Sequence, residues 1–196
     1  MKKLIYILML SILGMQANAT ILTFDDIPGG SNQNSFGNMP IYNGFNFSST
    51  LDWIDLESSR WNYGANSGDF ALLNNNYGVG VITEENNLDF TFDGLWAKKW
   101  RTSIDSNGND SLFGFIQGYN DGALVWSVDT SLNGSYEYYT GQLGQIDELR
   151  LGFGNNFLVD DITLNAQVSV PEPRLFILLG FALLALFFSR TKNKAA

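Results

Sequence analysis

The chain has 196 residues, contains neither cysteine nor histidine, and carries a formal net charge of −9. The missing residue types exclude disulfides, Ser-His-Asp and Cys-His catalysis, and the usual zinc sites. The two ends of the chain hold six of the 11 Lys and Arg residues but only one of the 20 acids, so the middle has a charge of −14. Because so acidic a surface repels phosphates, nucleic acid is excluded as a partner.

The first 19 residues have the pattern of a secretory signal peptide. Lys2 and Lys3 precede an apolar stretch over residues 4–13, and Ala17 and Ala19 supply the small side chains that a signal peptidase reads. We expect cleavage after Ala19. The alternative is an N-terminal membrane anchor, which the short apolar stretch and the Ala-x-Ala site disfavour.

The middle of the chain, residues 20–168, has the length of one domain and predicts an all-β fold. Short apolar runs alternate with Gly- and Asn-rich turn signals, and apolar spacing typical of helices is absent from this part of the sequence. The pattern favours a β-sandwich or jelly roll over a β-solenoid, because no repeat of fixed period is found. Strands are expected at residues 20–24, 42–47, 69–73, 79–82, 88–92, 95–102, 112–117, 123–128, 135–140, 148–153 and 157–164.

Two acidic pairs frame this domain and form a candidate metal site. Asp25 and Asp26 follow the first expected strand, and Asp160 and Asp161 lie within the last. Strand alternation would place Asp160 on one face with apolar neighbours, where an unpaired carboxylate is costly. If the first and last strands are adjacent, the four carboxylates converge and would bind a structural Ca²⁺. The alternative is that all four acids are solvated.

Tryptophans provide candidate carbohydrate-binding residues. Trp96 and Trp100 share strand parity with Lys98, so the three would lie on one face of a sheet. An exposed row of this kind would stack on sugar rings. The alternative for each tryptophan is packing in the sandwich, because large aromatic side chains usually fill such interiors.

The C-terminal end, residues 169–196, contains three consecutive features. A Pro-Glu-Pro motif comes first, an uncharged apolar run over residues 175–188 follows, and basic residues close the chain. As a helix the apolar run would reach about 21 Å, against about 30 Å of bilayer hydrocarbon. Arg174 and Arg190 at its ends would extend the span to both interfaces. We expect a transmembrane helix over residues 175–189 with a cytoplasmic tail; the alternative is a buried core helix.

This order of features resembles the PEP-CTERM sorting signal, the substrate of exosortase peptidases in Gram-negative bacteria. The resemblance implies that exosortase recognises Val170, Pro171, Glu172 and Pro173, and that Arg190 begins the basic stop. It also implies an exported protein that is first anchored in the inner membrane with its body in the periplasm. After processing, the protein would reach the cell surface or the extracellular space.

Several segments of the body are similar to the extracellular domain common in PEP-CTERM proteins, which resembles galactose-binding-like jelly rolls. They are the early Phe-Asp-Asp, the segments at residues 42–47 and 63–68, and the closing stretch at residues 157–164. Some jelly rolls of this kind hold calcium between the first and last strands. We expect a structural or adhesive protein of an exopolysaccharide matrix. A carbohydrate-binding module for exopolysaccharide is the alternative, and an enzyme is the least favoured class because no acid spacing selects a catalytic pair.

Overall fold

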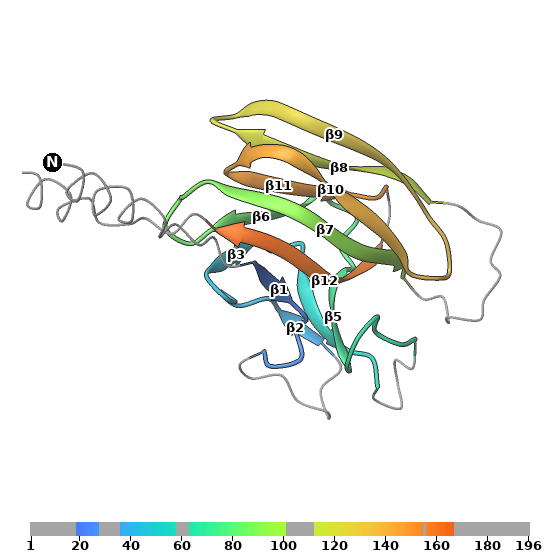
Figure 1. Ribbon diagram of the computed structural model, residues 1–196. Helices are drawn as coiled ribbons and strands as arrows, with labels where there is room; N and C mark the ends of the chain where they lie inside the picture. The colour runs from blue at the N-terminus through green and yellow to red at the C-terminus, as the bar shows by residue number, and fades with distance from the viewer. Residues whose placement is uncertain (1–18, 28–35, 58–62, 101–111, 155, 167–196) are drawn as a thin grey trace, which may run out of the picture.

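The computed structural model describes residues 19–27, 36–57, 63–100, 112–154 and 156–166, which fold into two stacked β-sheets. Figure 1 shows the two layers, with β10, β7 and β12 of one sheet in front of strands of the other. The strands are β1 (Thr20–Leu22), β2 (Phe36–Asn38), β3 (Phe45–Phe47), β4 (Asp52–Asp55), β5 (Phe70–Asn74), β6 (Gly80–Glu84), β7 (Phe90–Lys99), β8 (Leu112–Asn120), β9 (Ala123–Leu132), β10 (Glu137–Ile146), β11 (Glu148–Gly152) and β12 (Phe157–Ala166).

The larger sheet, called sheet A here, has the strand order β10-β7-β12-β5-β4-β2, and β1 pairs with β12 beside β5. The smaller sheet, sheet B, has the order β3-β6-β11-β8-β9. Every strand pair is antiparallel. The all-β, two-sheet sandwich expected from the sequence is therefore confirmed.

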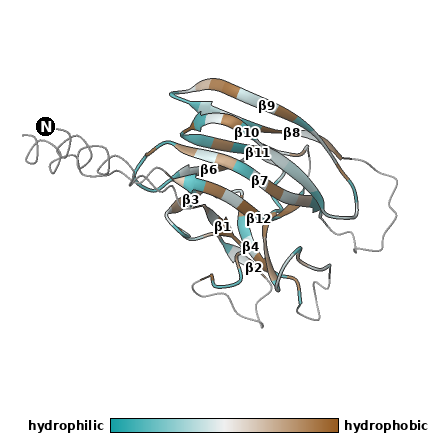
Figure 2. Cartoon of the chain, viewed as in Figure 1, coloured by the Kyte–Doolittle hydropathy of each residue, from teal (hydrophilic) through white to brown (hydrophobic). Residues whose placement is uncertain are grey.

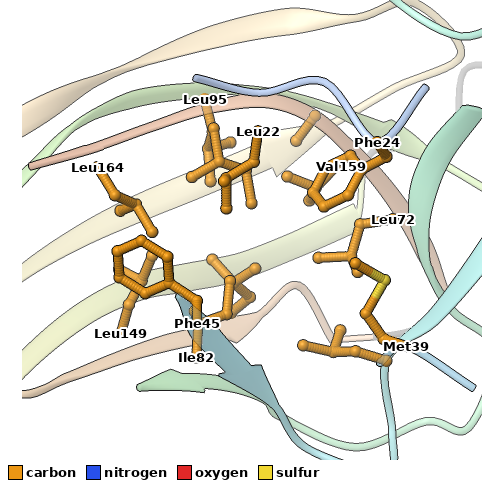
Figure 3. Close-up of a cluster of buried hydrophobic side chains, with 14 of the residues drawn as sticks. Leu22, Phe24, Met39, Phe45, Leu72, Ile82, Leu95, Leu149, Val159 and Leu164 are labelled. Carbon is orange, nitrogen blue, oxygen red and sulfur yellow. The ribbon is translucent and has the colours of Figure 1, made fainter. Parts of the chain in front are cut away.

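The main core lies between the two sheets. Figure 3 shows how side chains from both meet there: Leu72, Leu95 and Val159 come from sheet A, and Ile82 and Leu149 from sheet B. Figure 2 shows hydrophobic and hydrophilic residues alternating along the long strands. This alternation has a physical cause, because successive side chains of a strand point to opposite faces and only one face of each sheet meets the other.

The sequence predicts turns at residues 28–30, 43–44, 107–108, 121–122 and 133–134. Two of them are tight turns with positive φ angles at both residues: Asn43-Gly44, closed by the Tyr42–Phe45 bridge, and Asp121-Gly122, between β8 and β9. Residues 133–134 lie in the connection between β9 and β10. The predicted turns at residues 28–30 and 107–108 lie outside the described residues. So do the signal-peptide residues 1–18 and the whole predicted sorting signal. Among the residues that the structure describes, no helix is long and apolar enough to cross a membrane.

Three strand predictions were wrong in detail. β2 and β4 were not predicted, and the two expected strands at residues 88–92 and 95–102 are a single strand, β7. β4 has the sequence Asp-Trp-Ile-Asp and is buried on both faces. Its two acids made the segment look like an exposed loop in the sequence. Within β7, Gly94 has a φ of 151° and separates the core residues Phe92 and Leu95, so the alternation changes phase there. Such an irregularity resembles a break between strands when only the sequence is read.

Candidate functional site

The outer face of sheet A is divided into a covered part and an open part. The covered part is a second apolar cluster beneath the segment at residues 63–68, which we call the strap. Tyr63 and Ala65 of the strap pack on this cluster, together with Tyr136. Its buried members come from β4, β5, β12 and the ends of strands: Ile54, Leu56, Ala71, Leu73, Trp100 and Leu158.

Acidic residues of β12 hold the strap against the sheet. The Asp160 Oδ2 atom accepts hydrogen bonds from the backbone N–H groups of Asn66 at 2.8 Å and Ser67 at 3.0 Å. Asp161 accepts from the side chains of the same two residues, at 2.7 Å from Asn66 Nδ2 and 2.6 Å from Ser67 Oγ. The second predicted acidic pair is thus a clamp on a segment about 94 residues away in sequence.

One member of the first acidic pair, Asp25, binds the residues that directly follow the strap. Asp25 Oδ1 accepts from the backbone N–H groups of Asp69 at 2.9 Å and Phe70 at 3.1 Å, just after the strap. Asp26 instead accepts from the Tyr42 hydroxyl. Burial, and secondly this bond to Asp26, raise the pKa of Tyr42 to about 12. The first and last strands are adjacent, which was the condition for the four acids to converge: β1 pairs with β12 from Thr20↔Leu164 to Leu22↔Ile162.

The predicted calcium site remains untested. Asp25, Asp160 and Asp161 are directed at N–H and O–H donors of residues 66–70. Among the described residues, no group of three or more Asp, Glu, His or Cys side chains is arranged to hold a metal ion. These carboxylates therefore hold residues 66–70 in place through hydrogen bonds.

Strand alternation failed to place Asp160. The sequence predicts that Asp160 shares a face with Leu158, Ile162 and Leu164, but Ile162 and Leu164 lie in the main core, while Leu158 belongs to the covered cluster. Asp161 has a φ of 47°, and the register with β7 shifts between Asp160 and Thr163. This bulge reverses the phase of alternation, so Asp160 faces the strap and not the core between the sheets.

The predicted row of Trp96, Lys98 and Trp100 does not form an exposed platform. Trp100 is 5% exposed within the covered cluster, where its ring packs edge-on against Tyr63 at 5.2 Å between centroids. Lys98 is also fully buried. The strap and Tyr136 cover these two positions, which the sequence could not show. Trp100 is therefore corrected to a packing residue, and only Trp96 remains partly exposed.

Lys98 is a buried cation within the covered part. Its Nζ atom donates to the Tyr63 carbonyl oxygen at 2.8 Å and lies 5.2 Å from the centre of the Tyr136 ring. Burial lowers the pKa of Lys98 to about 8. Burial also raises the pKa of Asp160 to about 8, because its effect outweighs the backbone N–H donors that favour the ionised form. The pKa of Tyr136 is raised well above its ordinary value by burial and by the charges of Asp160 and Asp161.

The open part of the face is centred on Trp96 and Tyr138. These residues lie directly opposite each other on β7 and β10, with ring centroids 5.3 Å apart. Tyr138 is 49% exposed. Its ring extends over Gly94, where a Cβ atom would lie 2.1 Å from the tyrosine hydroxyl oxygen. That hydroxyl donates to the Asp93 carbonyl oxygen at 3.3 Å. The glycine therefore allows an aromatic side chain to lie across the strand.

Two polar side chains stand beside this aromatic pair. Asn165 Nδ2 on β12 donates to Asp93 Oδ2 at 2.6 Å and to Thr91 Oγ1 at 3.3 Å, which links β12 to β7. We call Trp96, Tyr138, Asp93 and Asn165 the platform. Of these four residues, only Trp96 is indicated by the sequence. Asp93 lies on the same strand as Trp96, but Tyr138 and Asn165 could have been found only from the pairing of β7 with β10 and β12, because both are far from Trp96 in the sequence.

The remaining predicted residues lie at the ends of the chain. Ala19 is exposed and immediately precedes β1, and its role in signal-peptide cleavage stays a prediction. Ala17, Val170, Pro171, Glu172, Pro173 and Arg190 lie outside the described residues, so their predicted roles stay predictions.

Comparisons with known proteins give a likeness of fold alone. No family model matches the chain, and no curated protein matches it. A mutant of the carbohydrate-binding module CBM29-2 aligns with 81% of this chain and 99% of its own, at 12% identity and a TM-score of 0.44. The CBM22-1 xylan-binding domain of Paenibacillus barcinonensis Xyn10C aligns with 80% of this chain and 99% of its own, at 9% identity and a TM-score of 0.45.

A third structure, TmCBM61 in complex with β-1,4-galactotriose, aligns with 64% of this chain and 90% of its own, at 11% identity and a TM-score of 0.35. The chain thus has a distant structural similarity to β-sandwich domains of carbohydrate-binding modules. At these values the similarity does not identify a ligand for this chain.

Proposed function

We propose that this chain is an exported, non-catalytic protein that binds carbohydrate through the platform on sheet A. The observation that carries the proposal is the paired arrangement of Trp96 and Tyr138 on an open sheet face, next to the polar side chains of Asp93 and Asn165. A sugar ring has an apolar face of C–H groups that packs on an aromatic ring, and hydroxyls at its edge that need polar partners.

Binding is favoured over catalysis by the composition of the platform. Glycoside cleavage without histidine uses two carboxyl groups on either side of the scissile bond, about 5 to 10 Å apart. The four platform residues include one carboxylate, that of Asp93, and it already accepts a hydrogen bond from Asn165. We therefore propose a carbohydrate-binding domain acting in an exopolysaccharide matrix, where such binding would also give the protein an adhesive role.

The test of binding is affinity electrophoresis of the purified protein through gels that contain polysaccharide. Trp96→Ala should reduce the retardation by at least about tenfold, because a central aromatic residue dominates small interfaces. Tyr77→Ala is the matched control: Tyr77 is 77% exposed in the turn between β5 and β6, outside the platform. Equal loss in both variants, or no loss in Trp96→Ala, would contradict the platform as the binding site.

Export is the second element of the proposal. The predicted signal peptide and the predicted sorting signal would deliver the domain outside the cytoplasm, where polysaccharide is accessible. Signal peptidase and exosortase would then be processing partners, and contact with the inner membrane would be transient. The test is the intact mass of the mature protein from its native host, with cell fractionation. A chain that starts at Thr20 and ends between Val170 and Pro173 would agree with this; retention of residues 175–188 in the inner membrane would contradict it.

A further inference from the structure

We infer that the ligand of the platform is an uncharged polysaccharide, without carboxylate or sulfate groups. This inference rests on the proposed carbohydrate binding and specifies the class of ligand. It depends on two independent properties of the open face: which hydrogen-bonding groups remain available, and which charges surround them.

Two side chains of the open face already use their donors within the protein. Asn165 Nδ2 donates to Asp93 and Thr91, and the Tyr138 hydroxyl donates to a backbone carbonyl oxygen. The donors left over are neutral and include the Trp96 indole N–H and the hydroxyls of Thr140 and Thr163, for which the structure shows no partner among the described residues.

Two acceptor oxygens of the platform also remain open. Asp93 Oδ1 and Asn165 Oδ1 accept no hydrogen bond from the described residues. A sugar hydroxyl can donate to each of them. A carboxylate or a sulfate offers acceptors only, so it would leave these oxygens unpaired and would face them with lone pairs. At these two oxygens the hydrogen-bonding pattern thus favours hydroxyl groups over carboxylate or sulfate groups.

The charge of the protein also favours an uncharged ligand. The described residues contain 17 Asp and Glu but only three Lys and Arg. None of those three cations is free at the platform. Lys98 is buried under the strap, Arg150 lies on sheet B paired with Glu148, and Lys99 is half-buried at the end of β7 with a partner of its own. The platform itself carries the negative charge of Asp93. An anionic polymer would therefore meet repulsion that no free cation of the described residues compensates.

The experiment compares neutral and acidic polysaccharides in the same gel assay at about 0.1 M salt, where charges within about 10 Å still interact. The probes are hydroxyethyl cellulose and a galactomannan as neutral polymers, and polygalacturonate and dextran sulfate as acidic ones. We expect a neutral polymer, and neither acidic polymer, to retard the full mature protein. Trp96→Ala and Tyr138→Ala should abolish the retardation, and Asp93→Asn should weaken it roughly tenfold, because a hydrogen bond to a charged acceptor is lost.

The outcomes separate this inference from the proposed function. Retardation by an acidic polymer that disappears in Trp96→Ala would keep the platform as a sugar site and overturn the neutral class. Retardation by neutral polymers that is unchanged in all three variants would place binding elsewhere and overturn the inference. No retardation of the wild-type protein by any of the four polymers would count against the proposed function itself.

Discussion

Asp160 lies directly opposite Trp96 in the pairing of β12 with β7, and the two residues mark the boundary between the covered and open parts of sheet A. Asp160 is fully buried and holds the strap through two backbone N–H groups. Trp96 is partly exposed and contacts Tyr138. We therefore expect substitutions in the covered part to change the stability of the protein. Substitutions in the open part should change the binding of a partner.

Gly68→Ala should destabilise the protein by about 3 kcal/mol, because it combines a strained backbone with overpacking. Gly68 has a φ of 53°, and an added Cβ would lie 2.1 Å from Asp25 Oδ2. The matched control is Gly44→Ala, which has a φ of 81° and nothing within 4 Å, so that only the backbone cost of about 1 kcal/mol remains. Urea denaturation followed by tryptophan fluorescence would measure both; equal losses would show that Asp25 does not pack tightly on the strap.

Stability should fall as the pH rises from about 4 to about 8, because of Asp160. Its pKa is raised to about 8 in the folded protein, whereas an unfolded Asp titrates near 3.9. Between these values the folded state binds more protons than the unfolded state, so the contribution of Asp160 decreases with pH, by at most about 1.4 kcal/mol per pH unit. Asp160→Asn should remove this part of the slope. The measurement is urea denaturation at successive pH values, with the exposed Asp129→Asn as control.

Lys98 should produce the opposite trend at higher pH. Its pKa is lowered to about 8 in the folded protein, against about 10.4 when unfolded. Between these values the unfolded state binds more protons, so the contribution of Lys98 to stability increases as pH rises. Together with Asp160, this gives a minimum of stability near pH 8. The same denaturation series on Lys98→Met should lack the rise above pH 8; a rise of unchanged size would assign it to another group.

Trp96 and Trp100 should differ sharply in what their removal changes. Trp100→Ala should cost about 3–5 kcal/mol of stability, because it leaves a cavity in the covered cluster. Trp96→Ala should cost about 1 kcal/mol or less and should act on polysaccharide binding instead. Thermal unfolding and affinity electrophoresis on both variants check this. A binding loss in a folded Trp100→Ala protein that equals the loss in Trp96→Ala would restore Trp100 as a contact residue.

Gly94→Ala should weaken polysaccharide binding indirectly, by displacing Tyr138 and not through a contact of residue 94 with the ligand. The new Cβ would occupy the place of the Tyr138 hydroxyl, so the tyrosine ring must move off β7. We expect a loss of binding similar to that of Tyr138→Ala, and no further loss in the double variant, because both changes remove the same ring position. Gly122→Ala, which has open space around it, is the control. Additive losses in the double variant would show that Gly94 acts independently of Tyr138.

How far the sequence predicts this fold depends on how regular each strand is. β8, β9 and β11 were placed with their correct first residues, since each is an apolar-rich run. β4 was missed because it is buried on both faces and its two acids flank its two apolar residues, so apolar and polar residues do not alternate along it. The break at Gly94 and the bulge at Asp161 misled the prediction for the same reason: each shifts the alternation by one residue without leaving a clear signal in the sequence.

The candidate site depended far more on tertiary structure. The sequence indicated that Asp160 and Asp161 are special, because carboxylates within an apolar strand require partners, but it could not name the strap as that partner. It also selected Trp96 and Trp100 equally, although one is open and the other covered.

By itself, the sequence determined the all-β class, the absence of cysteine and histidine chemistry, the strong negative charge, and the predicted processing signals at both ends. These follow from composition and local order, which do not depend on how strands pair. Only the tertiary structure decided which face of sheet A is covered and which residues share the platform. The reason is physical: β7, β10 and β12 bring Trp96, Tyr138 and Asn165 together through backbone pairing, and that pairing joins residues tens of positions apart.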